Sequence, residues 1–236
     1  MQLKKILTIL FFAINSSVLS AQTILIIEGR VENNSESGMW EGIYIPRSQP
    51  TTFIYRNNSI TSVNASGYLL QAGDEGVSGS NNNLDGEVIT GNKFTWNGTD
   101  PTSIIHGVFT GYNINAILKY NYLDNVPMGL LRKSNGMNNK SGGVAYNIVI
   151  NPKIACVAKG MNNVNIYNNT FYSTRTTSET WRGLVDIYTN TDGGLNARST
   201  GTKIFNNIFY TKHKILNIKI YEYECLPGFE SDYNLF

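Results

Sequence analysis

The hydrophobic and polar positions of the chain repeat in a short frame: an aliphatic residue, two further residues, Asn, any residue, and a hydrophobic residue. The two clearest copies are Ile-Tyr-Asn-Asn-Thr-Phe at 166–171 and Ile-Phe-Asn-Asn-Ile-Phe at 204–209. Looser copies precede them, and one more begins at the end of the sequence. The frame asparagines are Asn58, Asn92, Asn121, Asn147, Asn169, Asn207 and Asn234.

The spacing of these asparagines indicates a stack of repeating units. Successive frame asparagines are 34, 29, 26, 22, 38 and 27 residues apart. Repeats of this size form supersecondary units that bury a core only against their neighbours. Each copy is too short, and too rich in β-branched and aromatic residues, for a helix. Because the intervals are unequal, we predict strands that stack while loops vary in length, which is a parallel β-solenoid.

The frame asparagine has properties that suit a bend after a strand. Asparagine tolerates the left-handed backbone conformation, and its amide bonds backbone groups of a turn. In equivalent positions of successive coils, asparagines also form amide ladders. We therefore predict a structural role, without ligand binding, for a ladder made of Asn58, Asn92, Asn121, Asn147, Asn169 and Asn207.

A second strand is expected in each coil, after a loop rich in Gly, Ser, Asn and Thr. An opening strand at Thr23–Ile27 and another at Trp40–Ile45 come before the first frame. The second strands are predicted at Gly67–Ala72, Ser103–Phe109, Gly129–Lys133, Ile154–Lys159, Leu184–Tyr188 and Leu216–Ile220.

Through its frame copies, the chain resembles the right-handed parallel β-helix, or pectate-lyase-like, superfamily of secreted bacterial proteins over about residues 40–236. The resemblance implies an all-β right-handed parallel β-helix of about six to seven coils. It leaves the reaction open, because a fold alone does not give a function. Residues 230–236 enter a further repeat with no visible cap, so we expect a longer parent chain, a covering partner, or self-association through this C-terminal coil.

The first 21 residues have the pattern of a secretory signal peptide. Lys4 and Lys5 form a basic start, an apolar stretch follows, and Leu19-Ser-Ala21 offers a cleavage site. This predicts a secreted, periplasmic or cell-surface protein with one β-helix domain at 22–236. No other stretch is apolar for long enough to predict a transmembrane span.

Charge is distributed unevenly along the chain. Residues 22–110 hold four basic and nine acidic residues, whereas residues 111–219 hold 13 basic and four acidic residues. The basic part creates a field that attracts anions, although a solvated surface with no ligand gives the same composition. Nucleic acid is not an expected partner, because the chain is exported and the remainder after the signal peptide is neutral.

Stacking the second strands places charged side chains in one outward stripe. Coils lie about 4.8 Å apart, and alternation along each strand turns every other side chain outward. Arginine pairs with carboxylates and aromatic rings pack on sugar faces, so the stripe suits an acidic polysaccharide. The predicted stripe consists of His106, Arg132, Lys133, Lys159, Asp186 and Lys219, with Trp181 and Arg182 beside it.

The resemblance also implies a reaction. In the lyases of this fold, a basic residue removes the proton next to a uronate carboxylate, and a cation neutralises that carboxylate. On this basis Lys133 or Lys159 is the candidate base and Arg132 the neutralising group, with His106 and Asp186 as weaker catalytic candidates. A lysine base needs a lowered pKa, which the adjacent Arg132 would give Lys133. Ordinary exposed lysines remain the alternative.

Other site types have little support. Asp74, Glu75, Asp85 and Glu87 are a weak calcium candidate and fit solvated turns better, and no zinc or phosphate-loop motif is present. Hydrolases need two carboxylates across a sugar, and no Asp-Asp pair exists. Whether Cys156 and Cys225 pair is left open.

Two functions therefore remain in view. The first is a β-helix that binds an acidic polysaccharide and cleaves it by β-elimination. The second is a non-catalytic surface, scaffold or carbohydrate-binding β-helix.

Overall fold

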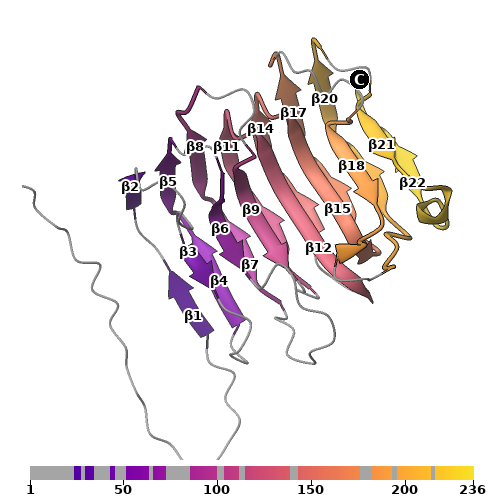
Figure 1. Cartoon of the computed structure of the whole chain (residues 1–236), viewed down its shortest axis with the longest axis horizontal. Coiled ribbons are helices and arrows are strands. Elements are labelled where there is room, and N and C mark those ends of the chain that lie inside the picture. Colours follow the sequence, from indigo (N-terminus) through magenta and orange to yellow (C-terminus); the bar gives the residue numbers. More distant parts are fainter. Residues whose placement is uncertain are drawn as a thin grey trace, which may run out of the picture.

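A computed structural model shows an all-β chain wound as a right-handed parallel β-helix, which confirms the predicted fold class. In Figure 1 the coils follow one another in chain order, from indigo to yellow. The structure describes residues 24–27, 30–34, 43–45, 52–63, 66–72, 86–99, 104–111, 115–138, 143–175, 182–192, 196–213 and 216–236. The predicted signal peptide lies outside these residues.

Three parallel sheets run along the stack, here named sheets A, B and C. Among the described residues, sheet A has eight strands and sheets B and C have seven each, so seven coils contribute one strand to every sheet and the last strand of sheet A begins a further coil. Sheet A consists of β1 (Ile24–Ile27), β4 (Thr52–Arg56), β7 (Val88–Thr90), β10 (Ile117–Lys119), β13 (Gly143–Ala145), β16 (Asn165–Tyr167), β19 (Lys203–Phe205) and β22 (Glu230–Asp232).

Sheet B follows sheet A in every coil after a sharp bend, and sheet C follows sheet B. Sheet B consists of β2 (Arg30–Asn34), β5 (Ser59–Ser62), β8 (Lys93–Trp96), β11 (Tyr122–Asp124), β14 (Ile148–Ile150), β17 (Thr170–Ser173) and β20 (Ile208–Thr211). Sheet C consists of β3 (Ile43–Ile45), β6 (Tyr68–Ala72), β9 (His106–Gly111), β12 (Met128–Asn138), β15 (Ile154–Asn162), β18 (Val185–Tyr188) and β21 (Ile218–Ile220), and a 3₁₀ turn, η2 (Tyr223–Cys225), follows it.

Each sequence frame spans two strands rather than one strand and a bend. Ile166 lies in β16, Asn169 follows the bend, and Phe171 lies in β17. The two hydrophobic positions of the frame point into the solenoid, where Ile166 and Phe171 are fully buried. The predicted second strands correspond to sheet C, within a few residues at their ends.

The frame asparagines form a continuous amide ladder at the bend between sheets A and B. The backbone N–H and the Nδ2 of Asn121 both donate to Oδ1 of Asn147, at 3.0 Å each. The Nδ2 of Asn147 also donates to the carbonyl of Leu118 in the preceding coil. The same pattern runs from Asn58 to Asn234. Each amide is therefore used for coil-to-coil bonds rather than presented to a ligand.

The left-handed residue of this bend is the one before the ladder asparagine, which corrects the expectation that the ladder asparagine takes that conformation. Its φ is positive in every coil where the bend is described, and it falls between 53° and 67°. Asparagine and glycine accept this conformation readily, whereas large side chains are strained in it. The residues in this position are Asn57, Gly91, Tyr120, Tyr146, Asn168, Asn206 and Tyr233.

Candidate functional site

The predicted basic stripe was expected on the outer face of sheet C, and the charged residues found there lie in two separate rows of residues in register, here called files. Lys133 and Lys159 are paired in register, and their file continues to Tyr188. Asp186 and Lys219 are paired in a neighbouring file that contains the buried Val157. The expected single stripe is therefore two short groups.

Arg132 was expected to face solvent, and this prediction is wrong. It stands in register with Ala158 and Ile187 of the core and is completely buried. Its Nη1 donates to the carbonyl of Ala116 at 2.8 Å. Burial lowers the pKa of Arg132 to about 10, an effect that Cys156 and Glu87 oppose, so the side chain stays charged at neutral pH. Arg132 is a charge inside the solenoid, out of reach of a ligand on the outer face.

The direction of Arg132 was misassigned because both faces of sheet C are apolar. Leu130 packs in the main core, whereas the next residue, Leu131, packs in a second cluster on the outer side with Phe109 and Val157. Two consecutive leucines give no signal for the direction of the following residue. The same register places Cys156 inward, which settles an alignment that the sequence left open.

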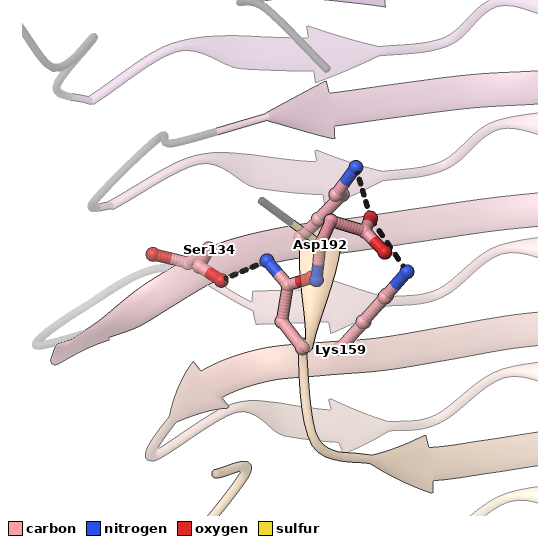
Figure 2. Close-up of polar contacts among 5 residues, drawn as sticks. Ser134, Lys159 and Asp192 are labelled. Atoms are coloured by element: carbon pink, nitrogen blue, oxygen red, sulfur yellow. Dashed lines mark hydrogen bonds and ion pairs between the residues drawn. The ribbon is translucent and has the colours of Figure 1, made fainter. Parts of the chain in front are cut away.

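The two lysines proposed as bases converge on one carboxylate. The Nζ of Lys133 lies 2.6 Å from Oδ2 of Asp192, and the Nζ of Lys159 lies 2.7 Å from the same oxygen. Figure 2 shows Lys159 and Asp192 pointing toward each other, with Ser134 beside them. Partial burial alone would raise the pKa of Asp192, but the hydrogen bonds and charges of the two lysines outweigh it and lower that pKa. Both ammonium groups already hold a carboxylate, so neither is available as an unpaired base.

The segment that brings Asp192 to the lysines is anchored at several points. The Nδ2 of Asn190 donates to the carbonyl of Ser134 at 2.7 Å, and Oδ1 of Asn190 accepts the backbone N–H of Asp192. Asn190 also exchanges two backbone hydrogen bonds with Ala197. Ser199 then donates to the carbonyl of Tyr188. Asp192 is therefore held in place by backbone bonds as well as by the lysines.

The remaining members of the stripe are also engaged with neighbours. His106 lies against Met128 and the ring of Tyr68, and burial, reinforced by the charge of Lys133, lowers the pKa of His106 to about 3. It was expected to face solvent, and it is instead partly buried and neutral.

Asp186 was also expected to point into solvent, and it is fully buried. It accepts hydrogen bonds from the backbone of Gly183 and the hydroxyl of Tyr221, with Arg182 Nη1 at 3.6 Å. Lys219 lies 4.3 Å from the centre of the Tyr221 ring.

Several predicted residues can be placed only in part. Trp181, Asp74, Glu75 and Asp85 lie outside the described residues. Glu87 is buried rather than in a solvated turn. Within the described part of the chain, no group of three or more His, Cys, Asp or Glu is arranged to hold a metal ion. Cys156 and Cys225 are both buried and both free thiols.

A surface that the sequence did not single out lies on the outer side of sheets A and B. Tyr120 and Tyr146 sit at the bend between the sheets, with 57% and 44% of their surface exposed, and their rings stack 5.1 Å apart. On sheet B, Tyr172 and Tyr210 stack 4.8 Å apart and are also exposed. We call this surface the tyrosine ledge, which consists of Tyr120, Tyr122, Tyr146, Tyr167, Tyr172 and Tyr210.

Two lysines flank the ledge. The Nζ of Lys119 lies 5.8 Å from the centre of the Tyr120 ring, and the Nζ of Lys93 lies 5.9 Å from that of Tyr122. Beside the bend is a cavity of about 190 Å³, lined by Ile117, Lys119, Tyr120, Gly143, Ala145, Tyr146 and Tyr167. The signal that could have found it is the Tyr-Asn pair at 120–121 and again at 146–147 in adjacent coils, where the other coils have Asn-Asn, Gly-Asn or, at 233–234, Tyr-Asn.

No helix in the described residues is long and apolar enough to cross a membrane. Comparison with protein-family models, with curated proteins and with solved structures finds no match. The resemblance to pectate-lyase-like proteins therefore remains a prediction from the sequence frame.

Proposed function

We propose that this protein is a non-catalytic, polysaccharide-binding β-helix of the cell exterior, which holds a glycan chain along the tyrosine ledge. The observation that supports it is the set of exposed, mutually stacked rings on the outer side of sheets A and B. Monomeric proteins rarely expose contiguous apolar patches unless these are used for binding. Flat rings with polar hydroxyl edges offer an apolar face and a hydrogen-bonding group together, as a sugar does.

A glycan suits the ledge because both are extended. Stacked coils repeat every 4.8 Å or so, and the ring pairs Tyr120–Tyr146 and Tyr172–Tyr210 each join adjacent coils. A polymer running parallel to the solenoid axis beside the bend would meet the rings of Tyr120, Tyr146 and Tyr167 in three successive coils. Lys93 and Lys119 at the margin add positive charge, which favours a glycan with acidic groups.

Cleavage by β-elimination has weaker support than binding. A general base must reach the proton that it removes and be able to accept it. Lys133 and Lys159 both hold Asp192, and Arg132 faces the core, so the implied base and neutralising group do not meet at an open surface.

Binding and turnover are separated by one experiment. The purified protein is incubated with polygalacturonate, alginate and an uncharged β-glucan, while affinity electrophoresis reports binding and ultraviolet absorbance reports unsaturated uronate products. We expect retarded migration on at least one polymer and no rise in absorbance. The double variant Tyr172→Ser/Tyr210→Ser should weaken the retardation by about tenfold or more, as expected for aromatic anchors.

The control is Tyr223→Ser, which removes an exposed tyrosine of η2 outside the ledge. It should bind like the parent. Product formation would overturn the non-catalytic assignment, and absence of retardation on all three polymers would overturn glycan binding.

A further inference from the structure

The cavity on the outer face of sheet A exists because one strand presents two small side chains. The outward positions of β10 are Ile117 and Lys119, whereas the positions in register on β13 are Gly143 and Ala145. On the other side, β16 presents Asn165 and Tyr167. The surface is therefore lower over strand β13 than over its two neighbours, which carry larger side chains. We call this depression the notch, and it contains the cavity of about 190 Å³.

Two tyrosines form the wall of this notch in a strained backbone conformation. Tyr120 and Tyr146 both have φ of 56°, in the left-handed region where a bulky side chain is a genuine outlier. The coils that follow use Asn168 and Asn206 at the same position, which accept this conformation at little cost. Tyr233 takes the same conformation in the terminal coil, and Tyr120 and Tyr146 are the pair that occupies it in two adjacent coils, beside the notch.

Backbone strain of this kind persists where the surrounding structure enforces it, and it is concentrated at binding sites. The small residues of β13 are a separate observation, because they lie on a strand and not at the bend. Both features coincide at the same cavity. Lys119 is the charged residue in its lining.

We infer that this notch is the anchoring subsite of the glycan, in which one pyranose ring rests on the small floor of β13 against the rings of Tyr120, Tyr146 and Tyr167. This assignment rests on the proposed glycan binding and names the place where it is strongest. The Lys119 ammonium stands at the edge of the hollow, where it donates to a hydroxyl or pairs with a carboxylate of the bound sugar. The rest of the ledge guides the neighbouring sugars.

The decisive variant is Tyr120→Asn/Tyr146→Asn. It removes both rings and installs the residue that other coils use at this bend, so it relieves strain while deleting the wall. Binding of polygalacturonate, alginate and the uncharged β-glucan is measured by affinity electrophoresis, and the melting temperature by differential scanning fluorimetry. We expect affinity to fall by about tenfold or more for whichever polymer the parent binds, as at other aromatic hot spots. The melting temperature should stay the same or rise.

A second variant fills the notch without touching a tyrosine. Ala145→Thr places a β-branched residue in the file where β7 already carries Thr90, so the strand should accept it. Affinity should again fall by about tenfold or more. The matched control, Thr90→Ala, changes the same file away from the notch and should leave affinity unchanged.

The outcomes separate the subsite from glycan binding in general. If the parent binds a polymer and both variants bind it equally well, the notch is not the subsite, although the ledge remains a binding surface. If the Asn variant loses binding but its melting temperature falls by several degrees while Ala145→Thr still binds, the tyrosines support the fold and the assignment is wrong. If the parent binds none of the three polymers, the subsite fails together with the proposed function.

Discussion

The outer face of sheet C and the tyrosine ledge carry their polar groups in opposite ways. On sheet C, Lys133, Lys159 and Asp192 meet one another, and the surrounding side chains are largely buried. On the ledge, Tyr120 and Tyr146 are exposed and are kept in a conformation that the chain could have avoided. The density of charged residues in the sequence predicted the site on sheet C, but those charges pair with one another. The rings of the ledge are exposed and leave a surface for another molecule.

The largest effect that would test this contrast is on stability at sheet C. Asp192→Ala would leave Lys133, which is only 4% exposed, without its nearest carboxylate. Removing one partner of a buried ion pair costs about 3–5 kcal/mol, and because Asp192 is 38% exposed we expect about 2–3 kcal/mol. Urea unfolding gives the free energy of unfolding.

A control for this loss is the double variant Lys133→Met/Asp192→Ala, which removes the buried charge as well. It should recover most of the stability, because an apolar replacement of a buried pair is often neutral. A single variant as stable as the parent would mean that sheet C does not depend on its own ion pairs, and its lysines would again be candidates for a ligand.

A smaller effect is expected from His106 as pH falls. Its pKa is about 3 in the folded chain and 6.5 in a solvated histidine, so the unfolded chain binds a proton first. Stability is then fully present above pH 6.5 and is lost progressively as pH falls below it. Between pH 6.5 and 5 the loss should be about 1–2 kcal/mol. In His106→Gln this part of the unfolding profile should flatten, and an unchanged slope would show that His106 is solvated.

The smallest effect concerns the lysines of the ledge. Lys119→Met keeps the aliphatic stem beside Tyr120 and removes the charge. If the bound glycan is acidic, its affinity should fall by about fivefold or less, and the salt dependence of binding should weaken, because exposed charges are screened beyond about 8 Å. Stability should not change. A loss as large as that of the tyrosine variants would make charge, rather than ring contact, the basis of recognition at the ledge.

The sequence predicts the solenoid well because its main signal, the repeated asparagine frame, can be read directly along the chain. Each ladder asparagine, such as Asn147, needs only an equivalent residue in the next coil, and the repeat shows that residue directly. Strand order and sheet composition follow from such a repeat. The left-handed position was misassigned by one residue because Asn-Asn pairs such as 168–169 hide which member takes it.

The site was harder to predict because it depends on which way each side chain points and on contacts between residues far apart in the sequence. Leu130 and Leu131 are both buried, so alternation did not reveal that Arg132 points inward. Asp192 reaches Lys133 from 59 positions away in the sequence, and no local pattern announces that contact. The notch follows from Gly143 and Ala145, whose small size has meaning only once their neighbours on β10 and β16 are known.

The ladder also determines which changes of length the protein tolerates. Its bonds join equivalent atoms in adjacent coils and are the same whether 22 or 38 residues separate the two asparagines. Segments between the strands can therefore grow or shrink without disturbing it. A duplication or deletion running from one ladder asparagine to the next would restore every amide pair, whereas one that stopped within a coil would orphan a buried amide. The molecule is thus free to change length in whole coils, and each added coil brings its own bend position at which a tyrosine or an asparagine can be placed.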